Sequence, residues 1–220
     1  MTSLITGANR GIGLALAQHL AAKGESIVAT HRGAVPASQS GITWQHLDVV
    51  DPASHADLTK RLDGLPLDLL VCNAGIYLEK GDTLAKGFDP AKWAATFAVN
   101  VTGVFLTVQH LLPNLRTVKG KIAIISSAMG SDARAPGGSY IYRASKAAAL
   151  NLGRNLAAEL RRDNIAVGIY HPGWVRTDMG SSAADIDTNE SATGLLRRFE
   201  ALSQVTTGCF ESYDGTRLEF

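Results

Sequence analysis

Apolar and polar residues follow two alternating patterns along the chain. Short β-rich runs bounded by turn residues predict strands at residues 3–5, 26–30, 43–47, 67–72, 121–126, 165–170 and 209–213. Longer segments with a helical period predict helices at residues 12–22, 52–62, 91–115 and 139–161. This alternation is typical of an α/β fold, with a mostly parallel seven-stranded sheet and helices on both faces.

Residues 179–207 depart from the alternation. The segment is rich in Ser, Ala, Asp and Thr before the apolar and basic stretch 195–202, and it lies between the last two predicted strands. We expect it to form a mobile lid over a substrate. No repeat or linker marks a domain boundary, and 220 residues with 45% hydrophobic content suffice for one core. We therefore predict a single domain over residues 1–220.

Composition narrows the possible partners. The net charge is +1, which does not favour binding to nucleic acid or to an anionic membrane. No apolar stretch is expected to approach the roughly 18 residues that span a bilayer, and the first residues do not resemble a secretory leader. We expect a cytoplasmic protein that binds small molecules.

Cys72 lies in an apolar run and is expected to be a buried free thiol, not the disulfide partner of Cys209.

A glycine-rich run, Thr6-Gly7-Ala8-Asn9-Arg10-Gly11-Ile12-Gly13, follows the first predicted strand and opens the first predicted helix. Glycines let the backbone turn sharply and approach a ligand, and the free N–H groups of a helix start favour a pyrophosphate. A structural turn without a ligand would show the same glycines. Its position in a chain of alternating strands and helices favours a dinucleotide site in a doubly wound, Rossmann-type sheet.

The end of the second predicted strand bears on the choice of dinucleotide. Sites that select NAD usually place an acidic residue there to accept a hydrogen bond from the ribose 2′-hydroxyl. This chain has Thr30-His31-Arg32 instead. Arg32 and Arg10 together could clamp a 2′-phosphate, so NADP(H) is favoured over NAD(H). The alternative is that both arginines are ordinary solvated charges.

Six further motifs follow the glycine run in a fixed order. They are Asp48, Asn73-Ala74-Gly75, Asn100, Ser127, Tyr142-x-x-x-Lys146 and Pro172-Gly173. With the Thr-Gly-x-x-x-Gly-x-Gly turn, this ordered set resembles the short-chain dehydrogenase/reductase family, from Thr6 to about Thr177. The resemblance implies a nicotinamide-dependent oxidoreductase.

The resemblance also implies a set of cofactor-binding residues. Asp48 resembles the carboxylate that holds the adenine amino group, and Asn73 resembles the residue that braces the sheet beside the adenosine ribose. From the residues alone, Asp48 could instead cap the turn it begins, and Asn73 could be a turn residue. The loop from Pro172 resembles the one that seats the nicotinamide carboxamide. The implied set is Gly7, Asn9, Arg10, Gly11, Ile12, Gly13, Arg32, Asp48, Val49, Asn73, Ala74, Gly75, Tyr142, Lys146, Pro172, Gly173, Val175 and Thr177.

Tyr142 and Lys146 are the candidates for proton transfer. Their spacing of four residues places them on one face of a predicted helix. A nearby ammonium favours tyrosinate, so we expect the pKa of Tyr142 to be lowered. An isolated Tyr and Lys at this spacing are common and usually lie on a helix surface. The support for a catalytic role therefore comes from the ordered motifs around the pair. By resemblance, Lys146 also bonds the nicotinamide ribose. Tyr140 has no lysine at the same spacing and is expected to pack or to line a pocket.

Ser127 resembles the serine that bonds the substrate oxygen, although Ser126 is an alternative. Ser127 precedes Tyr142 by 15 residues, which is longer than the usual family spacing. The extra length falls in the glycine-rich residues 128–139. The run from Ser126 to Lys146 is similar to that of a C-factor-like subgroup of small carbonyl reductases, so we expect this loop to contribute to substrate selection.

Asn100 resembles the asparagine that holds a water molecule for proton relay to Lys146, and a local helix kink is the alternative.

His171 is expected to be structural because Tyr142 already supplies an acid. Trp93 and Trp174 could line the substrate pocket or the core. The remaining histidines, His19, His31, His46, His55 and His110, show no metal-ligand spacing, so no metal is expected.

The leading hypothesis is an NADPH-dependent reductase of small aldehydes or ketones, with Asn100, Ser127, Tyr142 and Lys146 as catalytic residues. An NAD(P)-dependent alcohol dehydrogenase would use the same residues in the opposite direction. A regulatory or signalling protein that binds the dinucleotide without turnover is the alternative from another class. The helices at 91–115 and 139–161 have modestly charged outer faces, and the resemblance implies a homodimer or homotetramer formed through them.

Overall fold

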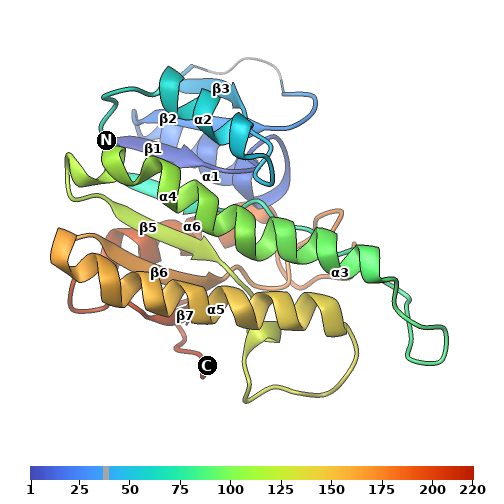
Figure 1. The fold of residues 1–220 in the computed structure, drawn as a ribbon. Coiled ribbons are helices and arrows are strands. Elements are labelled where there is room, and N and C mark those ends of the chain that lie inside the picture. The colour runs from blue at the N-terminus through green and yellow to red at the C-terminus, as the bar shows by residue number, and fades with distance from the viewer. Residues whose placement is uncertain (37–39) are drawn as a thin grey trace.

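The computed structural model describes residues 1–36 and 40–220. Within these residues, seven strands form one sheet. They are β1 (Thr2–Ile5), β2 (Ser26–His31), β3 (Ile42–His46), β4 (Leu69–Cys72), β5 (Lys121–Ile125), β6 (Ala166–His171) and β7 (Phe210–Ser212). The order is β3-β2-β1-β4-β5-β6-β7, and every neighbouring pair is parallel (Figure 1). The predicted Rossmann-type, doubly wound sheet in a single domain is confirmed. Each predicted strand agrees with an observed one to within two residues at either end.

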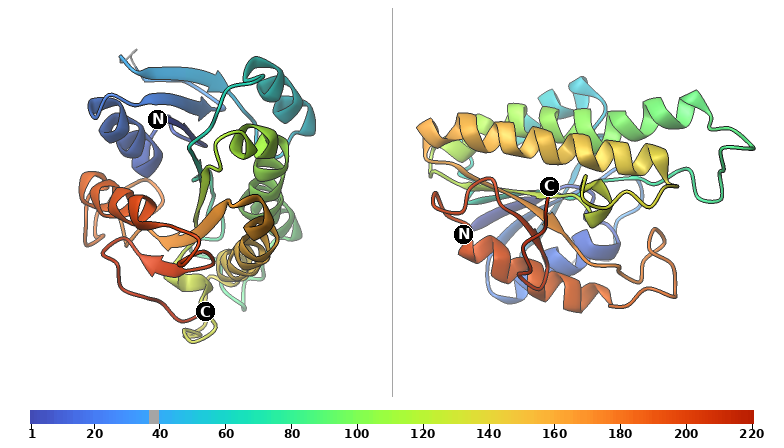
Figure 2. Two further views of the ribbon diagram at one scale, coloured as in Figure 1. Left: turned by 90° about the vertical axis from the view of Figure 1, so that its left-hand side faces the viewer. Right: turned by 90° about the horizontal axis from the view of Figure 1, so that it is seen from below.

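Helices cover both faces of the sheet. They are α1 (Gly11–Ala22), α2 (Pro52–Arg61), α3 (Pro90–Phe97), α4 (Gly103–Arg116), α5 (Tyr140–Leu160) and α6 (Thr188–Ala201). α1 and α6 pack together on one face, and α2, α4 and α5 lie on the other (Figure 2). Strand order reverses between β1 and β4, and ligands of doubly wound sheets bind in the crevice beyond the carboxyl ends at this point.

The predicted helix at 91–115 is interrupted. α3 and α4 are joined by a π-helical turn, Ala98–Thr102, which contains Asn100. Single π-helical turns are frequent at functional sites because the wider turn redirects the side chains around it. Asn100 therefore lies where the predicted helix is interrupted.

The continuous helical stretch Pro90–Arg116 corrects one argument from the sequence. By length and composition alone it could cross a membrane, with a hydropathy of 1.4, against the expectation that no apolar stretch approaches that length. Its residues Val104, Val108, Leu111 and Leu115 are buried in the core. Packing against the sheet therefore accounts for much of its apolar character.

Helix α6 was not predicted, and it changes the interpretation of residues 179–207. Asp187 caps it by accepting 2.9 Å hydrogen bonds from the backbone N–H groups of Asn189 and Glu190. Its buried residues include Ala192, Leu195, Leu196 and Phe199, a helical spacing that packs in the core beside α1. A lid over the whole of 179–207 is incompatible with this burial. The lid prediction is restricted to residues 179–187.

Candidate active site

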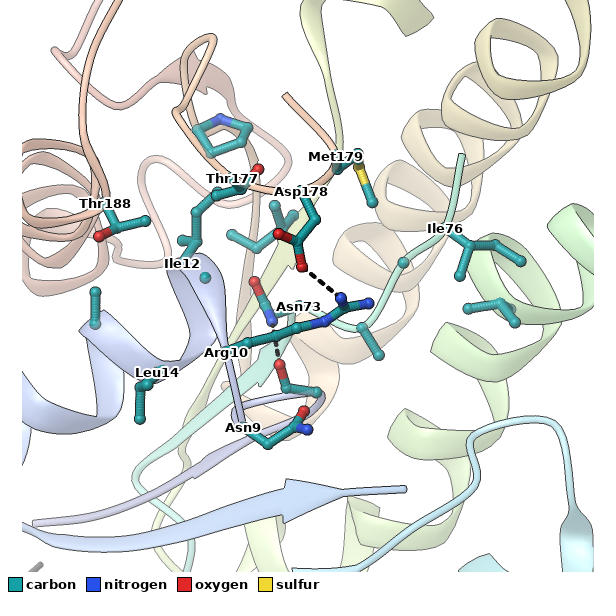
Figure 3. Close-up of a pocket in the computed structure, with 18 of the residues that line it drawn as sticks. Asn9, Arg10, Ile12, Leu14, Asn73, Ile76, Thr177, Asp178, Met179 and Thr188 are labelled. Atoms are coloured by element: carbon teal, nitrogen blue, oxygen red, sulfur yellow. Dashed lines mark hydrogen bonds and ion pairs between the residues drawn. The ribbon is translucent and has the colours of Figure 1, made fainter. Parts of the chain in front are cut away.

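A cleft of about 510 Å³ opens beyond the carboxyl ends of β1, β4, β5 and β6 (Figure 3). It runs from the glycine-rich turn before α1 to the side chains of Tyr142 and Lys146 on α5. Most of the implied cofactor residues line it, namely Gly7, Asn9, Arg10, Gly11, Ile12, Arg32, Asp48, Val49, Asn73, Ala74, Gly75, Tyr142, Lys146, Pro172 and Thr177.

Contacts with the segment after β4 fix the glycine-rich turn. The Asn73 side-chain amide donates to the carbonyl oxygens of Thr6 at 2.9 Å and Gly7 at 3.1 Å. Gly7 has a left-handed backbone, φ 62°, and a Cβ there would lie 3.0 Å from the Cα of Ala74. A Cβ on Gly13 would lie 2.5 Å from Nδ2 of Asn73. Asn73 therefore braces the turn, as the resemblance implied, and these two positions have no room for a larger residue.

The start of α1 fits a phosphate group. Its N-cap residue Arg10 has an extended backbone and makes no side-chain hydrogen bond to the first turn. The first turn also holds no acidic residue. Backbone N–H groups at an uncapped helix start, together with the helix dipole, favour an anion. A nicotinamide dinucleotide therefore fits the turn through its pyrophosphate.

Gly13, Gly173 and Val175 do not line the cleft, although the resemblance implied that they would. Gly13 lies behind the turn, against the Asn73 amide and the carbonyl of Gly7. Gly173 has a left-handed backbone, φ 87°, and packs on Ile186 and Tyr213. Val175 is buried. These residues shape the walls of the cleft from behind.

At the adenosine end, the two arginines of the predicted 2′-phosphate clamp lie in separate ion pairs. Arg10 forms a 2.6 Å ion pair with Asp178, a residue that the sequence analysis did not single out (Figure 3). Arg32 lies 4.0 Å from the carboxylate of Asp48. Asp48 also accepts a hydrogen bond from the backbone N–H of Val50, so it faces the cleft and caps its own turn.

At the other end of the cleft, Tyr142 and Lys146 lie one helical turn apart, as predicted. The ammonium of Lys146 donates a 2.9 Å hydrogen bond to the carbonyl of Ile125 and lies 5.6 Å from the centre of the Tyr142 ring. Burial lowers the pKa of Lys146 to about 8. Burial also raises the pKa of Tyr142 to about 12, while a hydrogen bond with Ser127 acts in the opposite direction.

The expectation that Lys146 lowers the pKa of Tyr142 is therefore wrong for this structure. Desolvation disfavours the charged form of a phenol, and here it outweighs the other influences. The ammonium donates its hydrogen bond to a backbone carbonyl, and it is not among the groups that act on the pKa of the phenol. The phenol is fully protonated at neutral pH.

The two serines after β5 have different surroundings. The Ser126 hydroxyl donates to the backbone carbonyl of Lys146 at 3.1 Å, so it ties the strand end to α5. The Ser127 hydroxyl lies near enough to the Tyr142 phenol to lower the pKa of that phenol, and it accepts a 3.1 Å hydrogen bond from the backbone N–H of Met129. Of the two hydroxyls, that of Ser127 is the one beside the phenol.

Gly130, which the sequence analysis treated only as part of a loop, brings Ser127 close to α5. It ends the short 3₁₀ turn Ala128–Gly130. A Cβ on Gly130 would lie 2.6 Å from the backbone carbonyl carbon of Lys146. The Met-Gly-Ser sequence after Ser127 contains the glycine, but its partner on α5 is visible only in three dimensions.

Asn100 is buried at the centre of a bonding network. Its side-chain amide donates to the carbonyl of Ile76 at 2.9 Å and to the hydroxyl of Ser145 at 3.0 Å, while its Oδ1 accepts from the N–H of Ile76 at 2.9 Å. The side chain thus joins the π-helical turn, the segment after β4 and α5. A structural role for Asn100 is established by these bonds, and the proposed water relay stays a prediction.

Other candidates from the sequence lie outside this group. His171 is mostly buried, and burial lowers its pKa to about 4, so it is neutral at pH 7. Trp93 stacks on Phe97, and Trp174 is half exposed and donates to the carbonyl of Gly180. Cys72 and Cys209 are both free. Within residues 1–36 and 40–220, no cluster of three or more ligating side chains could hold a metal.

Several lining residues have no counterpart in the sequence motifs. Arg176, Asp178 and Met179 flank the implied residue Thr177, and Thr188 is the first residue of α6. Arg176 and Asp178 were indicated only by the loop after Pro172-Gly173, whereas Met179 and Thr188 lie in the predicted lid segment 179–207. Asp187 is a residue type that commonly caps helices, and this signal in the sequence predicts a helix that starts at Thr188.

Comparison with known proteins places the chain in a class. The sequence model of the short-chain dehydrogenase family matches residues 1–187, and the chain belongs to this family. It is therefore an oxidoreductase that uses a nicotinamide dinucleotide.

Individual relatives support this assignment. C-signal from Myxococcus xanthus is 36% identical over 158 residues, which cover 70% of this chain and 92% of that protein. The NADPH-bound carbonyl reductase from chicken fatty liver is 32% identical, with a TM-score of 0.88, and the match covers 100% of this chain and 98% of that one. Carbonyl reductase Sniffer of D. melanogaster is 28% identical, with a TM-score of 0.92 and coverage of 100% and 99%.

Proposed function

We propose that this protein reduces the carbonyl group of a small aldehyde or ketone with NADPH and that Tyr142 donates the proton. The observation that carries the proposal is that Tyr142 and Lys146 line one end of a cleft whose other end is the glycine-rich turn, with Ser127 behind them beside the phenol. A carbonyl that enters beside Tyr142 meets a proton donor, a hydroxyl and a cation together.

Each side chain has a distinct task in this proposal. A nicotinamide held in the cleft would supply the hydride for the carbonyl carbon, and negative charge would then develop on the carbonyl oxygen. The Ser127 hydroxyl donates a hydrogen bond to that oxygen, and the Tyr142 phenol transfers its proton to it. The Lys146 ammonium, 5.6 Å from the ring centre, would hold the nicotinamide ribose, as the family resemblance implies.

The protonation state of Tyr142 favours the reductive direction. With its pKa raised to about 12, the phenol holds its proton at neutral pH, which is the form that a proton donor needs. Oxidation of an alcohol needs the phenolate, whose population rises with pH. We therefore expect carbonyl reduction at neutral pH and alcohol oxidation only in alkaline solution.

NADP(H) is the proposed cofactor. Arg32 follows β2 and lines the cleft, and β2 itself (Ser26–His31) contains no carboxylate. Arg10 is held by an exposed ion pair, which a 2′-phosphate could replace. Catalytic efficiency measured with NADPH and with NADH is the test. We expect a clear preference for NADPH, and a preference for NADH would contradict the assignment.

Activity is tested by following NADPH absorbance over a panel of aldehydes and ketones. We expect turnover with at least one small carbonyl compound. The second candidate, a signalling or regulatory protein without turnover, is favoured by the likeness to C-signal. It predicts NADPH binding without consumption across the whole panel. The buried, hydrogen-bonded Tyr142 supports the enzyme, because binding alone has no need of a proton donor.

We also propose that the protein forms a homodimer or homotetramer through α4 and α5. Phe105 on α4 is 43% exposed, a large apolar side chain that a second copy could cover. Sedimentation of the wild-type protein and of Phe105→Glu tests this. We expect an oligomer that the charge dissociates, and a monomeric wild-type protein at micromolar concentration would contradict it. The cytoplasmic location stays a prediction.

A further inference from the structure

Helix α5, which carries Tyr142, begins without a side-chain cap of its own. Its N-cap residue Ser139 has a left-handed backbone, with φ 48° and ψ 42°, and its side chain makes no hydrogen bond to the first turn. The first N–H groups of a helix have no partner inside the helix, and a buried one is costly to leave unpaired. The turn that carries the phenol therefore needs an acceptor from elsewhere in the chain.

Glu79, in the loop after β4, supplies that acceptor. Its Oε1 accepts a 2.6 Å hydrogen bond from the backbone N–H of Tyr142, a residue 63 positions away. In the same loop, the hydroxyl of Tyr77 lies 2.7 Å from the hydroxyl of Ser139, and the Tyr77 ring lies 4.8 Å from the Tyr142 ring. The loop holds the start of α5 at its N-cap, at an amide and at the aromatic ring.

Burial of Glu79 is not explained by packing. The residue is 2% exposed, and its second oxygen, Oε2, has no hydrogen-bond partner among the described residues. A buried polar atom without a partner destabilises a fold, and an apolar residue of similar size would avoid this cost. The carboxylate of Glu79 therefore has a role other than filling space in the core.

We propose that Glu79 is a positioning residue for Tyr142, which it holds through the backbone amide at the start of α5. The inference rests on the proposed function of Tyr142 as proton donor. Without the Glu79 contact, the first turn of α5 loses its acceptor. The phenol then loses its fixed position beside Ser127. Small displacements of a reacting group cost a large part of the rate, so the contact matters more for turnover than for cofactor binding.

The charge of Glu79 has a second effect, on the proton of the phenol. Burial is the largest cause of the raised pKa of Tyr142, and Tyr77 and then the negative charge of Glu79 raise that pKa further. Removal of this charge favours the phenolate, so Tyr142 would ionise at lower pH. The titratable side chains shown to act on the phenol or to lie against its ring are Tyr77, Glu79 and Lys146, and Tyr140 and Arg143 flank Tyr142 on α5.

Two substitutions separate the hydrogen bond from the charge. Glu79→Gln keeps an oxygen acceptor and removes the charge, whereas Glu79→Ala removes both. Glu159→Gln, at an exposed glutamate of the same helix, is the matched control. The readouts are kcat and KM for NADPH with 4-nitrobenzaldehyde, and an alkaline titration of the phenolate absorption band. Subtraction of the same titration with Tyr142→Phe added isolates the phenol, and circular dichroism monitors folding.

For Glu79→Ala we expect kcat to fall about 10-fold to 100-fold while KM for NADPH changes less than about threefold. For Glu79→Gln we expect kcat within about threefold of wild type and ionisation of Tyr142 at lower pH than in wild type. Rescue by glutamine together with the shifted titration is not expected of a residue that only fills space. If Glu79→Ala does not fold, the two results for Glu79→Gln decide.

Wild-type kcat in both variants, or an unshifted titration in Glu79→Gln, would overturn the inference. Failure of the proposed function looks different. There the wild-type protein reduces no carbonyl compound, or Tyr142→Phe remains active. The titration then still decides whether Glu79 acts on Tyr142.

Discussion

The two ends of the cleft are held by different kinds of contact. At the cofactor end, Asn73 bonds the backbone of the glycine-rich turn, and tight packing excludes side chains at Gly13. At the catalytic end, side chains from separate loops meet α5, with Glu79 at its first turn and Ser127 beside the phenol. The cofactor end is thus fixed by a compact motif, and the catalytic end by long-range contacts. Substitutions should therefore separate binding from turnover.

Among substitutions that move the backbone, the largest separation is expected from Gly130→Ala. The added Cβ would lie 2.6 Å from a backbone atom of Lys146, so the turn after Ser127 must move away from α5. We expect kcat to fall about 100-fold, while the dissociation constant of NADPH changes less than about threefold. Steady-state kinetics and fluorescence titration with NADPH measure the two effects. Gly33→Ala, where a Cβ meets open space, is the control. Equal losses of NADPH affinity and of kcat in Gly130→Ala would contradict the separation of the two ends of the cleft.

The opposite separation is expected from Gly13→Ala. Its Cβ would lie 2.5 Å from the Asn73 amide and 2.7 Å from the Gly7 carbonyl, so the turn must shift. We expect the dissociation constant of NADPH to rise about tenfold or more, with a loss of about 1–3 kcal/mol in the free energy of unfolding. Calorimetric titration and urea unfolding test this. Unchanged affinity would show that the turn tolerates a methyl group.

A smaller effect is expected on the stability of Lys146→Met, measured apart from the loss of activity that its proposed catalytic role also predicts. Burial lowers the pKa of Lys146 from 10.5 to about 8. Between these values the native state binds fewer protons at this site than the unfolded state, so the site makes unfolding harder as pH rises. The wild-type free energy of unfolding, minus that of Lys146→Met, should therefore increase from pH 8 to 10.5. Urea unfolding across this range measures the difference, and a flat difference would mean that the ammonium is not desolvated.

The smallest effect is expected at the exposed ion pair across the cleft. Asp178→Asn releases Arg10, whose side chain is 74% exposed. Because exposed pairs contribute little, we expect the affinity for NADPH to change less than about threefold, toward tighter binding. Lys23→Gln removes a similar exposed pair remote from the cleft and is the control. Weaker binding in Asp178→Asn would mean that Asp178 itself supports the cofactor.

The local motif at the cofactor end of the cleft could be predicted from the sequence, whereas the long-range contacts at the other end could not. The alternation of strands and helices and the glycine-rich turn follow from local patterns, because the turn and the apolar face of a βα unit are encoded by adjacent residues. Helix α6 was also readable in principle, from Asp187 as a cap and the spacing of its buried residues. The lid interpretation arose because polar residues before the helix concealed that periodicity.

Long-range pairings were beyond reach of the sequence. Glu79 and Tyr142 are 63 residues apart, and Arg10 and Asp178 are 168 apart, so no local pattern connects them. The pKa of Tyr142 was predicted in the wrong direction for a similar reason. The spacing to Lys146 is visible in the sequence, whereas the burial that outweighs the ammonium is a property of the fold.

The central claim is that Tyr142 donates the proton in an NADPH-dependent carbonyl reduction. Tyr142→Phe removes only the phenol oxygen, and Tyr140→Phe, at a partly exposed residue of the same turn, is the matched control. The measurement is the rate of NADPH oxidation with saturating carbonyl substrate, beside the NADPH dissociation constant. We predict a loss of about 10²–10⁴ in kcat for Tyr142→Phe, with NADPH binding preserved and the control near wild type. Wild-type turnover in Tyr142→Phe would contradict the account.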